Sequence, residues 1–183
     1  MIQPATGTLL IAEPFLKDPN FMRTVVLLCR HEIEQGSFGF VLNQSFHQSL
    51  DELVPDLNGF EWPVYTGGPV QKDTLHYLHA YPQLLPDCQE VAEGIYWGGD
   101  FEILKELIKD NSIEPDKIKF FLGYSGWDAQ QLDAEMAEKT WLTVSATSRL
   151  VFETPIEDIW KTSLRSLGGK YEMMIHFPTD PQL

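Results

Sequence analysis

The run VVLLC at residues 25–29 constrains the fold more than any other stretch of the chain. Every position from Val25 to Leu28 is apolar, whereas a strand with one face in water alternates apolar and polar residues. The run therefore predicts a strand that is covered on both faces. A short turn with Gly36 separates it from a second strand at 37–45, which indicates a β-hairpin and an antiparallel ladder at the centre of the fold.

Periodicity and capping patterns predict the other elements. Further strands are expected at 7–14, 72–81, 117–127 and 140–147, and helices at 49–54, 101–111, 129–139 and 155–167. The last helix has the fullest local pattern, because Thr154 precedes Pro155 at its start and Gly168 follows its end. Residues 171–180 are expected to form a short strand or an extended tail.

The composition is that of one globular domain. Of the 183 residues, 43% are apolar and 22% are charged, so we expect residues 1–183 to form one compact unit. The amino terminus has no basic segment before an apolar stretch, and no apolar run approaches the roughly 18 residues of a membrane span. We therefore expect a cytoplasmic protein without a membrane partner. Cys29 and Cys88 are far apart in sequence, which indicates neither a disulfide framework nor a zinc knuckle.

The charge balance disfavours direct DNA binding. Lys and Arg total 13 and Asp and Glu total 27, so the formal charge is −14. Such a chain repels a phosphate backbone unless its cations are gathered on one face, and here they are scattered along the sequence. A small ligand or a protein partner is expected instead.

Glycines at a strand end mark a first candidate site. Gly67 and Gly68, in VYTGGPV, either expose successive N–H groups to an anion or let the chain turn before Pro69. The turn is favoured, because the sequence has no phosphate-binding glycine motif with its lysine, and no cofactor is predicted. Asn43, at the end of the hairpin, either caps the next turn or donates to a ligand.

A second candidate lies in the stretch 121–135, FLGYSGWDAQQLDAE. Local helix patterns explain most of it, because Asp128 and Gln131 fit a capping box and Trp127 fits a hydrophobic staple. Glu135 is left unexplained. It either points back towards the same cleft or pairs with the lysine four residues later on an exposed helix face.

Two histidines raise the question of a metal site. His76 and His79 would share a metal on a helix, but 72–81 is predicted as a strand, on which an odd separation sends them to opposite faces. No metal is therefore predicted. His79 alone is either a general base or a hydrogen-bonded structural histidine.

These stretches together resemble the YqgE/AlgH family of uncharacterised bacterial proteins. The matching segments occur in order at 7–31, 36–43, 64–70, 78–79, 121–135 and 141–142. The resemblance implies a single α+β domain, whose mainly antiparallel, bifurcated sheet forms a pseudo-barrel with helices packed outside. It also implies that one member has been named a transcriptional regulator. The family's recurrent positions map here to Gly36, Gly39, Asn43, Tyr65, Gly67, Gly68, Pro69, His79, Gly123, Tyr124, Trp127, Gln131, Leu132 and Glu135.

Two functions follow as hypotheses. The leading one is a cytosolic binding or regulatory module, with transcriptional regulation as one form, that acts through a small ligand or a protein partner. Its pocket is expected around Asn43, Gly67, Gly68, His79, Trp127 and Glu135. The alternative is a hydrolase-like enzyme in which His79 and Glu135 act as acid and base, and it requires both groups within hydrogen-bond reach of one substrate position. An enzyme is the less favoured of the two.

Overall fold

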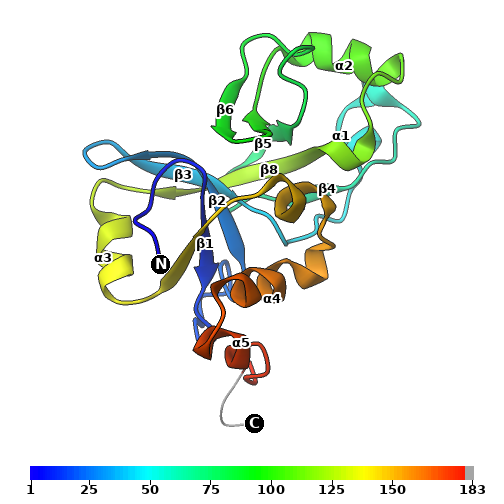
Figure 1. Ribbon diagram of the computed structural model, residues 1–183. Coiled ribbons are helices and arrows are strands. Elements are labelled where there is room, and N and C mark those ends of the chain that lie inside the picture. The colour runs from blue at the N-terminus through cyan, green and yellow to red at the C-terminus, as the bar shows by residue number, and fades with distance from the viewer. Residues whose placement is uncertain (180–183) are drawn as a thin grey trace.

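The computed structural model describes residues 1–179, in which a curled sheet carries helices on its outer faces (Figure 1). The described strands form one antiparallel sheet, except that β4 (Val64–Thr66) pairs parallel with β8 beside the main path. Across the sheet the main path runs β6 (Gln89–Ala92), β7 (Ile95–Trp97), β5 (Val70–His79), β8 (Ile118–Trp127), β3 (Gly36–Val41), β2 (Val25–Glu32), β1 (Thr8–Ala12) and β9 (Trp141–Ser145).

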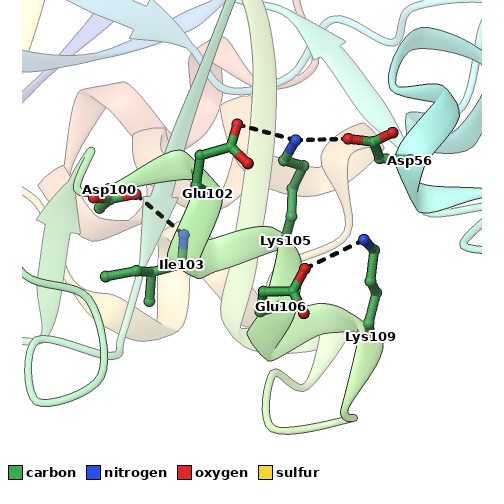
Figure 2. Close-up of polar contacts among 7 residues, drawn as sticks. All are labelled: Asp56, Asp100, Glu102, Ile103, Lys105, Glu106 and Lys109. Atoms are coloured by element: carbon green, nitrogen blue, oxygen red, sulfur yellow. Dashed lines mark hydrogen bonds and ion pairs between the residues drawn. The ribbon is translucent and has the colours of Figure 1, made fainter.

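The helices occur where capping and amphipathic patterns placed them, with one addition. They are α1 (Leu50–Leu53), α2 (Phe101–Lys109), α3 (Gln131–Ala137), α4 (Ile156–Leu167) and α5 (Lys170–Met174), with short 3₁₀ helices η1 (Pro55–Leu57) and η2 (Pro115–Lys117) and a π-helical segment η3 (Arg149–Glu153). At α2 the carboxylate of Asp100 accepts the N–H of Ile103 at 3.1 Å (Figure 2), which satisfies a donor that the first turn leaves free. The described residues contain no helix that is both long and apolar enough to span a membrane.

The prediction that the first apolar run is covered on both faces is confirmed. Along β2, Val25 and Leu27 belong to one buried cluster, while Val26 and Leu28 belong to another on the opposite face. Helix α4 contacts β1, β2 and β9 on the first side, and α3 contacts β3 and β9 on the second (Figure 1). The predicted hairpin of β2 and β3 is also present as an antiparallel pair. Between the two layers the positions Val25–Leu28 have no solvent-facing side, which explains why this part of the strand does not alternate, whereas Arg30 and Glu32 beyond it are exposed.

The sheet forks along β8. One edge of β8 pairs with β5, whereas the other edge pairs first with β4, at 120–122, and then with β3, at 125–127. Because β3 and β4 share this edge of β8, they diverge into two branches. The first branch consists of β3, β2, β1 and β9 and the second of β4, whereas β5, β7 and β6 lie beyond the opposite edge of β8. This confirms the bifurcated antiparallel sheet with helices outside.

The end of the chain differs from the prediction. Residues 171–174 belong to helix α5, so the expected strand or extended tail is wrong for them. Tyr171, Met174 and Ile175 share the helical spacing i, i+3 and i+4, and all three pack on the cluster beneath α4. Residue 180 of that prediction lies outside the described residues. At α4 the hydroxyl of Thr154 donates to the Arg149 carbonyl at 3.2 Å instead of capping the helix.

Candidate binding groove

Asn43 fastens the hairpin to the chain that precedes it. Its Oδ1 accepts the N–H of Val25 at 3.0 Å, and its Nδ2 donates to the carbonyl of Arg23 at 2.9 Å. Both ends of the amide are therefore engaged by backbone at the start of β2, and Asn43 acts as a bridge between the end of β3 and that start.

Gly67 occupies the fork of the sheet. Its N–H donates to Leu122 on β8 and its carbonyl accepts from Val41 on β3, both at 2.8 Å. A Cβ at Gly67 would lie 2.4 Å from the carbonyl oxygen of Gly123, and a Cβ at Gly68 would lie 2.2 Å from that of Tyr124. Both glycines are buried. The bare backbone is therefore needed so that the chain can pass against β8 at the point where β3 and β4 diverge.

His79 is fully buried and both of its ring nitrogens have partners. Nε2 lies 2.8 Å from the carbonyl oxygen of Gly98, and Nδ1 accepts the N–H of Tyr81 at 3.0 Å. A carbonyl can only accept, so Nε2 carries the proton and the ring is neutral. Burial lowers the pKa of His79 below its ordinary value, and the hydrogen bond to Gly98 opposes this effect.

Glu135 turns back from α3 towards the sheet. Its Oε2 accepts the indole N–H of Trp127 at 2.8 Å and that of Trp141 at 2.7 Å, and its Oε1 accepts from Gln131 at 3.3 Å. The predicted capping box is half present: Gln131 Oε1 accepts the N–H of Asp128 at 3.0 Å, but α3 begins only at Gln131 itself. The carboxylate therefore fixes two indoles that are almost fully buried.

The geometry separates the two groups of the hydrolase hypothesis. His79 pairs with Ile118 at the start of β8, whereas Glu135 contacts Trp127 at its end. A ten-residue strand spans about 30 Å at ~3.3 Å per residue, so the two side chains do not share a substrate position. The acid and base pair of that hypothesis is not brought together.

A groove of about 570 Å³ is lined by the β2–β3 hairpin on one side of β8 and by β5 and β7 on the other. Residues of β2, β3, β5, β7 and β8 and the start of α3 line it, and Trp127 is the one residue of the expected six that it contains. Its lining consists of Arg30, Gln35, Gly36, Ser37, Phe38, Val70, His76, Trp97, Tyr124, Gly126, Trp127, Asp128 and Gln131. The expected pocket therefore moves away from the glycine pair to the adjoining aromatic surface.

Half-buried rings form one wall of this groove. The centroid of Phe38 lies 4.8 Å from that of Trp97 and 5.9 Å from that of Tyr124, both in edge-to-face geometry. His76 lies within 6.4 Å of Trp97 and 6.1 Å of Tyr124. Rings that brace one another in this way keep their orientation without a ligand and present flat apolar surface to solvent.

Arg30 supplies the positive charge of the groove. Its guanidinium lies 5.3 Å from the centroid of Phe38 and 6.0 Å from that of Trp97. The ion pair with Glu32 is long, at 4.0 Å, and both side chains are about half exposed, so it holds Arg30 weakly. Burial lowers the pKa of His76, which leaves the arginine as the main cation of this wall.

Sequence reasoning did not identify four residues of this groove: Arg30, Phe38, His76 and Trp97. The sequence does indicate that two of them are neighbours, because Arg30 and Phe38 stand on either side of the predicted hairpin turn. Nothing local indicates that Trp97, sixty residues later, reaches the same wall. That contact depends on the pairing of β7 with β5 and of β5 with β8.

Comparison with known proteins agrees with this architecture. A family model described as AlgH-like matches residues 9–172. A UPF0301 protein of Chlorobium luteolum is 41% identical over 179 residues, which are 98% of this chain and 94% of the relative. A UPF0301 protein of Cytophaga hutchinsonii is 40% identical over 178 residues, 97% of each chain.

Two solved structures share the fold. The solution structure of the AlgH protein of Pseudomonas aeruginosa has a TM-score of 0.74 and 30% identity, and covers 96% of this chain and 97% of that one. A crystal structure of a protein from Corynebacterium diphtheriae has a TM-score of 0.80, with 94% and 92% of the two chains covered. Its 21% identity bears on the fold alone.

The forked antiparallel sheet with outer helices thus defines an α+β protein of a class already represented among solved structures. The chain belongs to the AlgH-like family.

Proposed function

We propose that the protein is a cytosolic binding module whose groove holds a small planar ligand with an acidic group. The single observation that carries this proposal is the preformed wall of Phe38, Trp97 and Tyr124 beneath the guanidinium of Arg30. A volume of about 570 Å³ matches that of a small-molecule pocket.

The chemistry of the wall selects the ligand class. Edge-to-face rings leave a flat face on which an aromatic ring stacks, and such contacts are worth about 0.5–1.5 kcal/mol each beyond burial. The guanidinium of Arg30 has a planar array of donors that matches a carboxylate or phosphate. Asp128 also lines the groove and opposes a second negative charge, so a ligand with one acidic group fits best.

A regulatory role follows if ligand occupancy is passed on to a partner. The formal charge of −14 makes a protein partner more favourable than direct contact with DNA. The groove adjoins a hollow of about 310 Å³ that shares His76 and Trp97 with it, so a ligand there also touches β5 and β7.

The proposal is tested by a ligand panel measured through backbone amide chemical shifts. The panel compares aromatic carboxylates and phosphates with neutral aromatic analogues. We expect shifts centred on Phe38, Trp97 and Tyr124, and Arg30→Gln should weaken the acidic ligands about tenfold while leaving the neutral ones nearly unchanged.

Gly126 allows the groove to be blocked without disturbing the core. A Cβ there would meet its nearest neighbour, the Tyr124 ring, at 3.5 Å, which is ordinary contact. Gly126→Val should therefore fill part of the groove and remove binding, while Ser145→Val, at an exposed position of β9, should not. Shifts that fall elsewhere, or binding that survives Gly126→Val, would refute the proposal.

A further inference from the structure

Lys119 is a buried lysine whose amine has no partner among the described residues. It lies on β8, its exposed fraction is 7%, and its Nζ has no hydrogen-bond acceptor. An unpaired charge in such a place is costly, so the amine either loses its proton or meets a partner from outside the described part of the chain.

A second buried lysine is paired with carboxylates, as buried charges usually are. Lys105, 9% exposed on α2, has its Nζ 2.7 Å from Asp56 and 3.1 Å from Glu102 (Figure 2). These hydrogen bonds raise the pKa of Lys105, whereas burial lowers the pKa of Lys119 to about 8. Within residues 1–179, one buried amine is thus paired with two carboxylates and the other with none.

A cavity of about 360 Å³ adjoins Lys119 and shares no residue with the groove. It lies between β4, the start of β8 and the segment that joins η3 to α4. The Nζ of Lys119 lies 5.1 Å from the ring centroid of Tyr65, which also lines the cavity. Three further rings complete an aromatic lining: Trp62, Phe120 and Phe152.

The charges around this cavity disfavour an anion. Asp116, Glu153 and Glu157 line it and are exposed, and none of them is paired with Lys119 in the described structure. Glu157 and Asp158 also occupy the first turn of α4, where they offset the positive end of the helix. A neutral aromatic molecule fits the lining better than a carboxylate or a phosphate.

We propose that Lys119 is a carbonyl-binding amine that takes a small neutral aromatic aldehyde in this cavity. The lone pair of the neutral Nζ forms a bond to the carbonyl carbon, and the C=O π electrons move to oxygen. That oxygen then leaves as water with the two amine protons, so the product is a reversible imine and nothing is oxidised or reduced. Desolvation among aromatic side chains is a recurrent way to make a lysine nucleophilic at neutral pH.

The test is competitive labelling of the native full chain with benzaldehyde and cyanoborohydride, read by peptide mass mapping. Lys117 is the matched internal control, since it lies two residues away, is exposed and is paired with Glu114 at 2.8 Å, which raises its pKa. At pH 7.5 about a quarter of an amine of pKa ~8 is neutral, against about 0.1% at an ordinary pKa of ~10.4. We expect Lys119 to be labelled at least about tenfold faster than Lys117.

Three further readouts separate the outcomes. Labelling of Lys119 should rise with a midpoint near pH 8, should be slowed by benzyl alcohol, and should equal that of Lys117 in urea. Equal labelling of the two lysines in the native protein would overturn the proposal. Protection by inorganic phosphate but not by benzyl alcohol would assign the cavity to anions and would overturn it as well. Because these readouts use the unmutated chain, they do not depend on a variant that folds.

Discussion

The indole of Trp141 donates its N–H to Oε2 of Glu135 at 2.7 Å, and the same oxygen accepts the indole of Trp127. The two rings meet edge to face, with centroids 6.2 Å apart, beneath helix α3. One carboxylate thus fixes the end of β8 and the start of β9, and with Trp127 it fixes one border of the groove.

Glu135→Gln should destabilise the protein although it changes one atom type. Both indoles donate to the same carboxylate oxygen, and the neutral oxygen of an amide is a weaker acceptor, so both bonds would weaken, while the amide NH₂ would face Nε2 of Gln131 in place of Oε1. We expect the free energy of unfolding to fall by about 1–3 kcal/mol. Urea unfolding followed by tryptophan fluorescence measures it, with Glu138→Gln, an exposed position just after α3, as the control. Equal stability of the two variants would show that the indole bonds contribute little.

Gly67→Ala should disrupt the fork, whereas Gly126→Ala should not. The new Cβ would lie 2.4 Å from a backbone oxygen at position 67, but 3.5 Å from the nearest atom at position 126. We expect a loss of more than about 2 kcal/mol for Gly67→Ala and a change within about 0.5 kcal/mol for Gly126→Ala. Thermal unfolding of the two variants side by side tests this difference. Equal unfolding midpoints would contradict the prediction.

Protonation of His79 should weaken the fold in acid. Its pKa in the folded state lies below the value of about 6.5 expected in the unfolded chain, so between these two values the unfolded state binds more protons. Stability is therefore complete above about pH 6.5 and falls as the pH drops through the folded pKa. Nitrogen-15 spectra should show Nε2 protonated and Nδ1 bare at pH 7. A His79 that takes up its second proton above pH 6.5 would contradict this assignment.

The stability of the wild-type protein should rise at alkaline pH as Lys119 loses its proton, and Lys119→Met should remove this rise. The folded pKa of about 8 lies below the unfolded value of about 10.4, so wild-type stability attributable to Lys119 increases between these values, by up to about 3 kcal/mol. Below pH 8 the buried charge is a cost, and methionine of similar shape should be at least as stable. The measurement is the free energy of unfolding of wild type minus that of Lys119→Met, from pH 7 to 10.5. The other titratable groups around the cavity are present in both proteins, so their contributions cancel in this difference: Tyr65, Asp116, Glu153 and Glu157. A difference that does not change with pH would argue for an unperturbed amine.

Local sequence patterns predicted the elements because they report burial along one segment at a time. The unbroken apolar run of β2 showed a strand between two layers, and the helix predicted from residue 101 begins there as α2, with Asp100 as its cap. The prediction for residues 171–174 was wrong because a single segment does not show which other element it packs against. Tyr171 and Met174 pack against the buried cluster that includes residues of α4, a contact that the local sequence does not indicate.

The groove could not be derived from such patterns. Arg30 and Phe38 are neighbours through the predictable hairpin, but Trp97 and Tyr124 reach them through pairings between strands far apart in sequence. His79 and Glu135 looked like partners because both are chemically versatile, yet β8 holds them at opposite ends.

The sequence by itself therefore determined six of the nine described strands, most helices and the hairpin, but not the short strands β4, β6 and β7 or the close backbone approach at Gly67. The tertiary structure alone decided where the sheet forks, which rings share a wall, and that Lys105 meets two carboxylates while Lys119 meets no hydrogen-bond acceptor in the described part of the chain. The physical reason is that periodicity encodes which face of an element is buried, whereas the choice of neighbour is made by the packing of all elements at once.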